Sequence, residues 1–153
     1  MSRVSPDQPF YSAGGVIIRA RFENMWKHRD GTLTGDEEAL HDMRVGSRRL
    51  RAALDVFDRA FPGDGYRRLR RLTALLTDEL GAVRDHDVML LELRKYRKGV
   101  PASERPGIDE LVSVIADERE VARRGLGRFF DELEADDYAG RMRRMFGAER
   151  DDG

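Results

Sequence analysis

The stretch "LHDMRVGSRRLRAALDVF" at residues 40–57 has the apolar spacing of an α-helix with one buried side. At about 100° per residue, its large apolar residues share that side. They are Met43, Leu50, Ala53, Leu54, Phe57 and, just beyond the stretch, Phe61. A column of basic residues lies beside them, spaced by three, four and three residues: His41, Arg44, Arg48 and Arg51. Val45, Ala52 and Val56 border the column on its other side, so the row of cations runs between two apolar flanks.

The chain before this stretch predicts a flexible lead-in over residues 1–11 and a first helix over about residues 12–29. The segment "DGTLTGDEE" is then a loop that enters the second helix. Thr34 is followed by Glu37 three residues later, which fits a capping box at the start of that helix.

The chain after this stretch predicts three further helices. "FPGDG" at residues 61–65 ends the second helix. A third helix runs over about residues 66–98, with a core stripe made of Leu69, Leu72, Leu76, Leu80, Val83, Leu90 and Leu91. A fourth begins near Ser103 and carries apolar residues as far as Leu133, including Leu111 and Val121. A short, basic helix follows from Tyr138.

These helices predict an all-α fold, because no alternation typical of β-strands occurs in the sequence. The chain of 153 residues is long enough for one modest core. We expect a single domain over residues 12–150, built as an up-down bundle of about four long helices plus a short C-terminal helix.

Composition excludes several classes of protein. The chain has no cysteine, so disulfides, thiolate zinc sites and cysteine catalysis are excluded. No uninterrupted apolar run approaches membrane-spanning length, and the N-terminus lacks the layout of a secretion signal, so we expect a cytoplasmic protein. The net charge of −1 hides a local asymmetry, since residues 44–71 hold nine arginines against three aspartates.

The third predicted helix has a basic edge of its own. Along one side of its core stripe lie Arg70, Thr77, Arg84, Val88 and Lys95, mostly seven residues apart. Two helices with basic edges could line a shared positive groove, although long arginine stems can also cover apolar surface and point their charges at water. Asp87 falls within the leucine stripe, where an unpaired carboxylate is costly. We expect it to pair with an arginine of the second helix or with His41.

Two segments of the sequence resemble the signature segments of the CHAD family, which is named for a histidine-bearing α-helical domain. Residues 40–57 resemble the family's H-x-x-R-V-x-x-R-R-L-R segment. "LGAVRDHDVMLLEL" at residues 80–93 resembles its L-G-x-x-R-D-x-D-V segment. The order and separation of the two segments also fit, and a weaker resemblance extends over the first and fourth predicted helices.

The resemblance implies a helical protein that binds inorganic polyphosphate, catalyses no reaction and needs no cofactor or metal. The family is associated with polyphosphate granules and often accompanies triphosphate-processing domains. Carried over by position, the ligand-facing residues are His41, Arg44, Arg48, Arg49, Arg51 and Arg84; the basic edge adds Arg70 and Lys95. Asp85 and Asp87 match the family's acidic positions, and we expect them to hold arginines in place.

The chain departs from the family in length. Members usually have two similar helical halves, related by a pseudo-twofold axis, with a basic pore between them. Here no second His-x-x-Arg segment follows, and no histidine occurs after His86. The chain thus resembles one half. Either two chains pair as a homodimer that rebuilds the two-half architecture, or the pore and its binding are lost; an isologous pair is the simpler solution.

Three other readings remain open from the residues alone. A nucleic-acid-binding module would use the same electrostatics, but the basic column lacks interleaved aromatic residues for base stacking. A metal-dependent phosphohydrolase of the HD type would draw its ligands from the two HD dipeptides and the remaining histidine: His28, His41, His86 and Asp87. A purely structural helical module needs no ligand at all.

Overall fold

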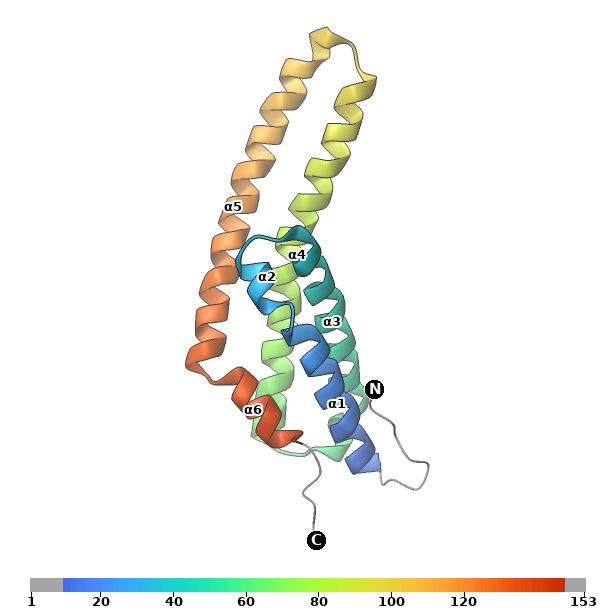
Figure 1. The fold of residues 1–153 in the computed structure, drawn as a ribbon, viewed down its shortest axis with the longest axis vertical. Coiled ribbons are helices and arrows are strands. Elements are labelled where there is room, and N and C mark those ends of the chain that lie inside the picture. Colours follow the sequence, from blue (N-terminus) through green and yellow to red (C-terminus); the bar gives the residue numbers. More distant parts are fainter. Residues whose placement is uncertain (1–9, 148–153) are drawn as a thin grey trace.

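The computed structural model describes residues 10–147, which form a helical bundle with a long two-helix hairpin projecting from it (Figure 1). The elements in chain order are α1 (Phe10–Trp26), α2 (Arg29–Leu33), α3 (Glu37–Val56), the 3₁₀ turn η1 (Asp58–Ala60), α4 (Asp64–Gly99), the 3₁₀ turn η2 (Ala102–Glu104), α5 (Arg105–Ala135) and α6 (Tyr138–Met145). Within these residues there is no strand. The predicted all-α bundle of four long helices and a short C-terminal helix is confirmed.

The N-terminal part differs in detail from the prediction. The structure has helix from Phe10 onward, so the last two residues of the predicted lead-in are helical, and residues 1–9 lie outside the described part of the chain. The first helix ends at Trp26, three residues before its predicted end, and the five-residue α2 lies over the start of the segment that was predicted to be a loop. Gly31 allows α2 to lie close against α3, because a Cβ at this position would be 2.7 Å from the Cβ of Ala39.

The cap of α3 is Asp36, and the capping box predicted at Thr34 is wrong. The Asp36 carboxylate accepts hydrogen bonds from the backbone N–H groups of Glu38 and Ala39, at 3.0 and 3.3 Å. The Thr34 hydroxyl instead donates to the carbonyl of Gly31 within the preceding turn. An aspartate at this position satisfies two N–H groups and also complements the helix dipole.

The core lies where α1, α3, α4 and α5 pack side by side, in that order, with α6 closing the lower end. Close approach of α1 and α3 depends on Gly46, where a Cβ would lie 2.9 Å from the Cα of Met25. Buried hydroxyl groups link α3, α4 and α6: Thr77 Oγ1 lies 3.1 Å from Ser47 Oγ, and Thr73 Oγ1 lies 2.7 Å from the hydroxyl of Tyr138. The first contact fixes the register of α3 against α4, and the second joins α4 to α6.

The upper part of α4 and α5 leaves the bundle as a two-helix arm, defined here as residues 88–118 (Figure 1). α4 has 36 residues and α3 has 20, so α4 continues far past its neighbour. No residue between positions 91 and 114 is buried in the described chain. Leu91 was predicted to lie in the core; it is 48% exposed, because no helix covers this side of the arm. Leu111 and Val121 are likewise exposed.

Candidate functional site: an arginine-lined groove

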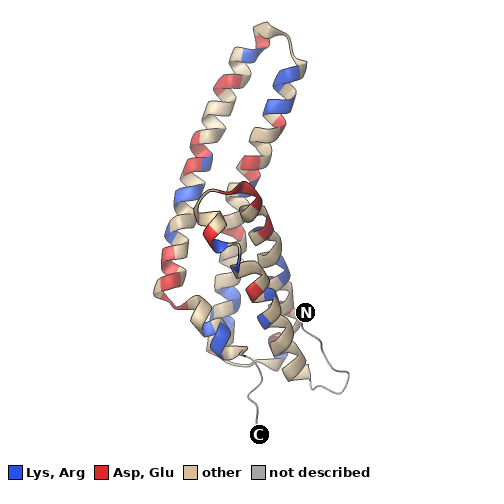
Figure 2. Cartoon of the chain, viewed as in Figure 1, with Lys and Arg blue, Asp and Glu red and all other residues tan. Residues whose placement is uncertain are grey.

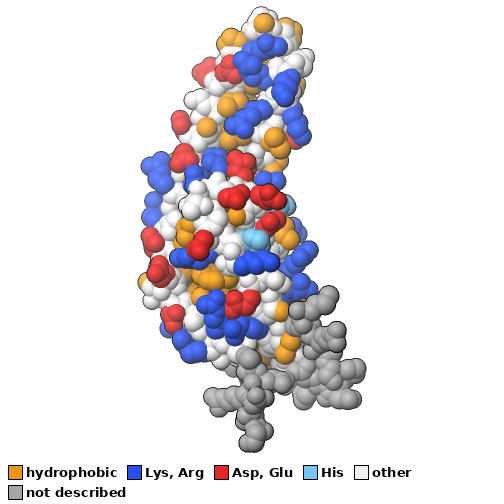
Figure 3. All heavy atoms as spheres, in the orientation of Figure 1, with side chains coloured by type: hydrophobic (Ala, Val, Ile, Leu, Met, Phe, Trp, Pro, Cys, Tyr) orange, Lys and Arg blue, Asp and Glu red, His pale blue; other side chains and the backbone are white. Residues whose placement is uncertain are grey.

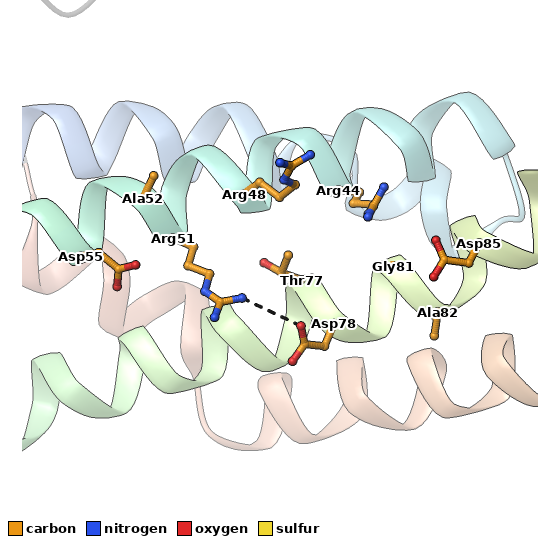
Figure 4. Close-up of a pocket in the computed structure, with 10 residues that line it drawn as sticks. All are labelled: Arg44, Arg48, Arg51, Ala52, Asp55, Thr77, Asp78, Gly81, Ala82 and Asp85. Carbon is orange, nitrogen blue, oxygen red and sulfur yellow. Dashed lines mark ion pairs between the residues drawn. The ribbon is translucent and has the colours of Figure 1, made fainter.

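A groove of about 690 Å³ lies between α3 and α4 (Figure 4). Its lining residues come equally from the two helices: Arg44, Arg48, Arg51, Ala52 and Asp55 from α3, and Thr77, Asp78, Gly81, Ala82 and Asp85 from α4. Three of the four members of the predicted basic column therefore face one hollow. Because they are three or four residues apart, they follow one another along the face of α3 at steps of about 5–6 Å.

Two of these arginines carry charges that no carboxylate neutralises. Arg44 and Arg48 form no ion pair within the described part of the chain. Arg51 reaches across the groove toward Asp78, with 3.9 Å between its Nη1 and Oδ1 (Figure 4). At that distance, with both side chains largely exposed, the pair is worth little. The groove is therefore lined by three guanidinium groups, of which none is firmly held by an acidic partner.

Local packing positions Arg44 at the wall of the groove. Its Nε is buried and has no hydrogen-bond partner among the described residues. Gly81 on α4 faces it, since a Cβ at that position would lie 3.5 Å from the same Nε. The carbonyl of Arg44 accepts a hydrogen bond from Ser47, which in turn contacts Thr77. Gly81 leaves room for the Arg44 side chain between the two helices, and the Ser47 hydroxyl fixes the backbone of α3 at Arg44. The Nη1 and Nη2 groups of Arg44 can then donate hydrogen bonds to a ligand.

A second hollow of about 320 Å³ continues from the groove toward the lower end of α4. It shares Arg51 and Asp55 with the groove and adds three further arginines and an alanine: Arg67, Arg70, Arg71 and Ala74. Here some charges are neutralised. Arg70 donates from Nε to Asp55 at 2.7 Å and lies 3.3 Å from Asp58, and the first of these bonds raises the pKa of Arg70. Arg67 pairs with Asp64 at 3.0 Å, whereas Arg71 forms no ion pair in residues 10–147.

The remaining predicted basic residues do not line the groove. His41 is exposed one turn before Arg44 on the same side of α3. Arg84 is half-buried on α4, outside the lining set. Lys95 lies on the arm, where it approaches Glu92 at 3.9 Å. Arg49 faces the other side of α3, in a separate hollow against α1.

The two predicted acidic positions have different surroundings. Asp85 lines the end of the groove nearest the arm and forms no ion pair with a described residue. Asp87 is buried and pairs with Arg119 of α5, not with an arginine of α3 or with His41 as expected. The partner lies on α5 because Asp87 belongs to the side of α4 that packs against that helix, while α3 packs against the neighbouring side.

The prediction omitted a second line of groove residues on α4. Arg67, Arg71, Ala74 and Asp78 recur at intervals of four, three and four residues, and all face the two hollows. This is the same helical spacing that identified the column on α3, so the periodicity was a usable signal.

Metal-ligating groups are not gathered in the described structure. His86 lies 2.6 Å from the carbonyl of Ala82 and 3.3 Å from Glu118, and Asp87 is held by Arg119. In residues 10–147 there is no cluster of three or more His, Cys, Asp and Glu side chains placed to hold a metal ion. None of the described helices combines the length and apolar character needed to cross a membrane.

An all-α bundle with an arginine-lined groove between the two signature helices defines the class of this protein. The family model described as "CHAD domain" matches residues 16–151, and the chain belongs to the CHAD family. That family is associated with polyphosphate binding. No curated protein and no solved structure matches the chain significantly.

Proposed function

We propose that this protein binds inorganic polyphosphate in the groove between α3 and α4 and does not catalyse its turnover. The observation that carries the proposal is the state of Arg44 and Arg48, which line the groove without an acidic partner in the described chain. Neighbouring positive charges repel one another, so two guanidinium groups without a paired carboxylate favour a bound anion. Arginine suits phosphate because its planar fork donates two parallel hydrogen bonds to phosphate oxygens.

The shape of the basic surface supports a chain-like ligand. The groove and the second hollow share Arg51 and Asp55, so the arginines of α3 lead directly to Arg67 and Arg71 on α4. Helical spacing sets the Cβ atoms of arginines on one helix about 5–6 Å apart. Their flexible stems then let the guanidinium groups contact several phosphates along one chain. Asp55, Asp78 and Asp85 also line this path, and they favour a ligand that contacts the arginines in turn over one that fills the whole volume.

Two alternatives receive less support. A metal-dependent phosphohydrolase needs converging ligands, whereas His86 and Asp87 are occupied by partners on α5 and α4. A binder of single-stranded nucleic acid uses exposed aromatic side chains for base stacking, and no aromatic residue lines either the groove or the second hollow in the described structure. A row of arginines without stacking surfaces matches a ligand that has phosphates and no bases.

The decisive experiment measures retention of long-chain polyphosphate by size exclusion with light scattering. We expect the wild-type protein to bind and Arg44→Ala/Arg48→Ala to lose at least about tenfold in affinity, because two charged hydrogen-bond donors are removed. Arg59→Ala/Arg128→Ala is the matched control, since both residues are exposed and lie outside the hollows described here. Equal binding by all three proteins contradicts the proposal.

Two further arms of this experiment separate the alternatives. Competition with DNA and RNA of equal phosphate content is expected to displace polyphosphate poorly; efficient displacement favours the nucleic-acid reading. Incubation of polyphosphate and nucleotides with Mg²⁺ or Mn²⁺ is expected to release no phosphate; release that is lost in His86→Ala favours the hydrolase reading. In the cell, the proposal expects the protein at polyphosphate granules, with wild-type localisation lost in Arg44→Ala/Arg48→Ala.

We also propose that two copies pair through their arms as a homodimer. Val88 and Leu91 lie on the same face of α4 as Thr77 and Arg84. Within the bundle this face contacts α3, through Thr77 and Ser47. In the arm this side has no cover within the described chain, and the two residues are 40% and 48% exposed. Among the described residues, the face of α4 that packs on α3 in the bundle is uncovered in the arm. The same face of a second copy could cover it in an isologous contact.

Charge supports an antiparallel arrangement of the two arms. The base of the arm adjoins the acidic start of α3, with exposed Glu37 and Glu38, and the tip of α4 is basic, with exposed Arg94 and Lys98 (Figure 2). An axis of twofold symmetry across the middle of the arm brings the tip of each copy to the base of the other. Both acidic-to-basic contacts then form together, as an isologous interface requires. Apolar side chains lie among basic ones along the arm in Figure 3.

Light scattering across a range of protein concentrations tests this pairing. Wild type is expected to have the mass of two chains, and Leu91→Lys that of one chain, because a charge would be buried in the apolar contact. Arg94→Glu/Lys98→Glu is expected to dissociate the pair, and adding Glu37→Lys/Glu38→Lys is expected to restore it. A wild-type mass of one chain at every concentration contradicts the pairing and leaves the binding proposal unaffected.

A further inference from the structure

A second basic hollow lies on the opposite side of α3 from the groove. It has a volume of about 330 Å³ and is lined by residues of two helices and the turn after α1: Arg21, Asn24, Lys27 and His28 on one side, and Asp42, Val45, Gly46 and Arg49 of α3 on the other. Its position follows from Gly46, which brings α3 against Met25 and leaves the longer side chains to surround a depression beside the contact.

The charges around this hollow are not neutralised within the described chain. Arg21, Lys27 and Arg49 form no ion pair with a residue of the part described. Asp42, which is half-buried at the same hollow, is also outside every ion pair of residues 10–147. Three cations and one carboxylate thus surround one small space without being used for structural pairing.

We infer that this hollow is a second anion site, specific for a phosphate group that carries a proton, as in free phosphate, pyrophosphate or the terminal group of a polyphosphate chain. The three cations supply charge and hydrogen-bond donors, and the Asn24 amide adds a further donor. The Asp42 carboxylate can only accept, so it repels a fully ionised oxygen and accepts a hydrogen bond from a P–OH group. The internal phosphates of a chain have no such hydroxyl, whereas a terminal group carries one at and below about pH 6, where a phosphate monoester holds its second proton.

The site differs from the groove in what it would hold. The groove and its extension form an open path suited to successive phosphates, and the hollow between α1 and α3 is less than half as large as the groove itself. Arg49, which the signature segment groups with the groove arginines, belongs to this second site by position. The two sites can therefore be abolished separately.

The test uses isothermal titration with pyrophosphate and with sulfate at about pH 6. It uses the Arg44→Ala/Arg48→Ala background, which removes the two arginines of the groove that are unpaired in the described chain. We expect pyrophosphate to bind at one site per chain. Adding Arg21→Ala/Arg49→Ala is expected to weaken it at least about tenfold, and adding Arg59→Ala/Arg128→Ala is expected to leave it unchanged. Sulfate, which has no proton to donate, is expected to bind poorly and to bind better after Asp42→Asn. Absence of pyrophosphate binding in this background, or equal binding of sulfate and pyrophosphate, overturns the inference.

Long-chain polyphosphate then distinguishes the two sources of the terminal group. If the hollow holds the end of a chain that lies in the groove, Arg21→Ala/Arg49→Ala in the otherwise wild-type protein lowers long-chain affinity. If it holds free pyrophosphate, long-chain affinity is unchanged and only the pyrophosphate titration is lost. Both results support the second site, and neither depends on whether Arg44→Ala/Arg48→Ala abolishes long-chain binding.

Discussion

Arg119 of α5 donates a hydrogen bond from Nε to the carboxylate of Asp87 on α4, and the two side chains are only 16% and 3% exposed. Arg119 also approaches Glu37 of α3 at 3.9 Å, so the pair lies where three helices meet and where the arm leaves the bundle. A buried carboxylate requires such a cation, because the cost of removing it from water is recovered only by close pairing.

We predict that Asp87→Ala destabilises the protein by about 3 kcal/mol, because it leaves the Arg119 charge buried without a partner. For a chain of this length, that corresponds to a fall in Tm of about 6–12 °C. The double variant Asp87→Leu/Arg119→Leu is expected to lose much less, since it removes both charges. Denaturant unfolding measures both, and an equal loss in the two variants contradicts the account of the pair.

We predict that Gly46→Ala destabilises the protein by about 1–3 kcal/mol, because the new methyl group meets the backbone of Met25 at 2.9 Å and forces α1 away from α3. Gly107→Ala is the matched control, since a Cβ there meets no atom within 4 Å and alanine is the better helix former. Thermal unfolding should show a lower Tm for the first and an equal or higher Tm for the second. Equal behaviour would show that the contact is looser than described.

We predict an acid-dependent contribution from Glu23, which connects α1 to α6. Arg143 donates to its carboxylate at 2.8 and 3.2 Å, and Arg19 donates at 3.1 Å; the Arg143 bonds are the main reason that its pKa lies below the ordinary value of 4.5. A lowered pKa in the folded state means that the stabilisation is complete above pH 4.5 and is lost as the pH falls through the folded value. The contribution is below about 1 kcal/mol, because the groups are partly exposed.

Unfolding free energies of wild type and Glu23→Gln, measured from pH 7 to pH 3, check this prediction. The difference between the two proteins is expected to be largest near pH 7 and to decrease toward the acid end of this range. A difference that is constant over the whole range contradicts the assignment of the carboxylate charge.

We predict that polyphosphate affinity falls steeply with salt, since each contacted phosphate releases counterions. If the slope per contact is similar to that of a single-stranded nucleic acid, about 0.7, then Arg44→Ala/Arg48→Ala lowers the slope of log K against log salt concentration by about 1.4. Titrations at several salt concentrations measure the slope for both proteins and for Arg59→Ala/Arg128→Ala. An unchanged slope in the groove variant would mean that these two arginines do not contact phosphate.

Periodicity predicted the features that belong to a single helix. The core side of α3 and the column from His41 to Arg51 follow from 100° per residue, and both are present in the structure. The same rule separates Arg49 from Arg48 by about 100°. The resemblance to the signature segment assigned both Arg48 and Arg49 to one ligand-binding set. The structure places them in different hollows.

Features that depend on two helices could not be predicted in this way. The partner of Asp87 depends on the axial position of α5 relative to α4. The spacing of apolar residues within one helix carries no information about that position. Leu91 has the spacing of a core residue, yet it is exposed because α3 begins too late in the chain to cover it. The length mismatch between α3 and α4, visible only after folding, creates the arm.

The unbroken path of α4 from the groove to the arm has a mechanical consequence. The stretch from Gly81 to Gly99 is about 27 Å long at 1.5 Å per residue, and it is one continuous helix. A tilt of about 5° at the groove therefore displaces the far end by about 2 Å, as a lever does. A ligand that pushes α3 and α4 apart would therefore also move the tip of the arm. In the proposed dimer, binding in the groove would be coupled in this way to the alignment of the two arms.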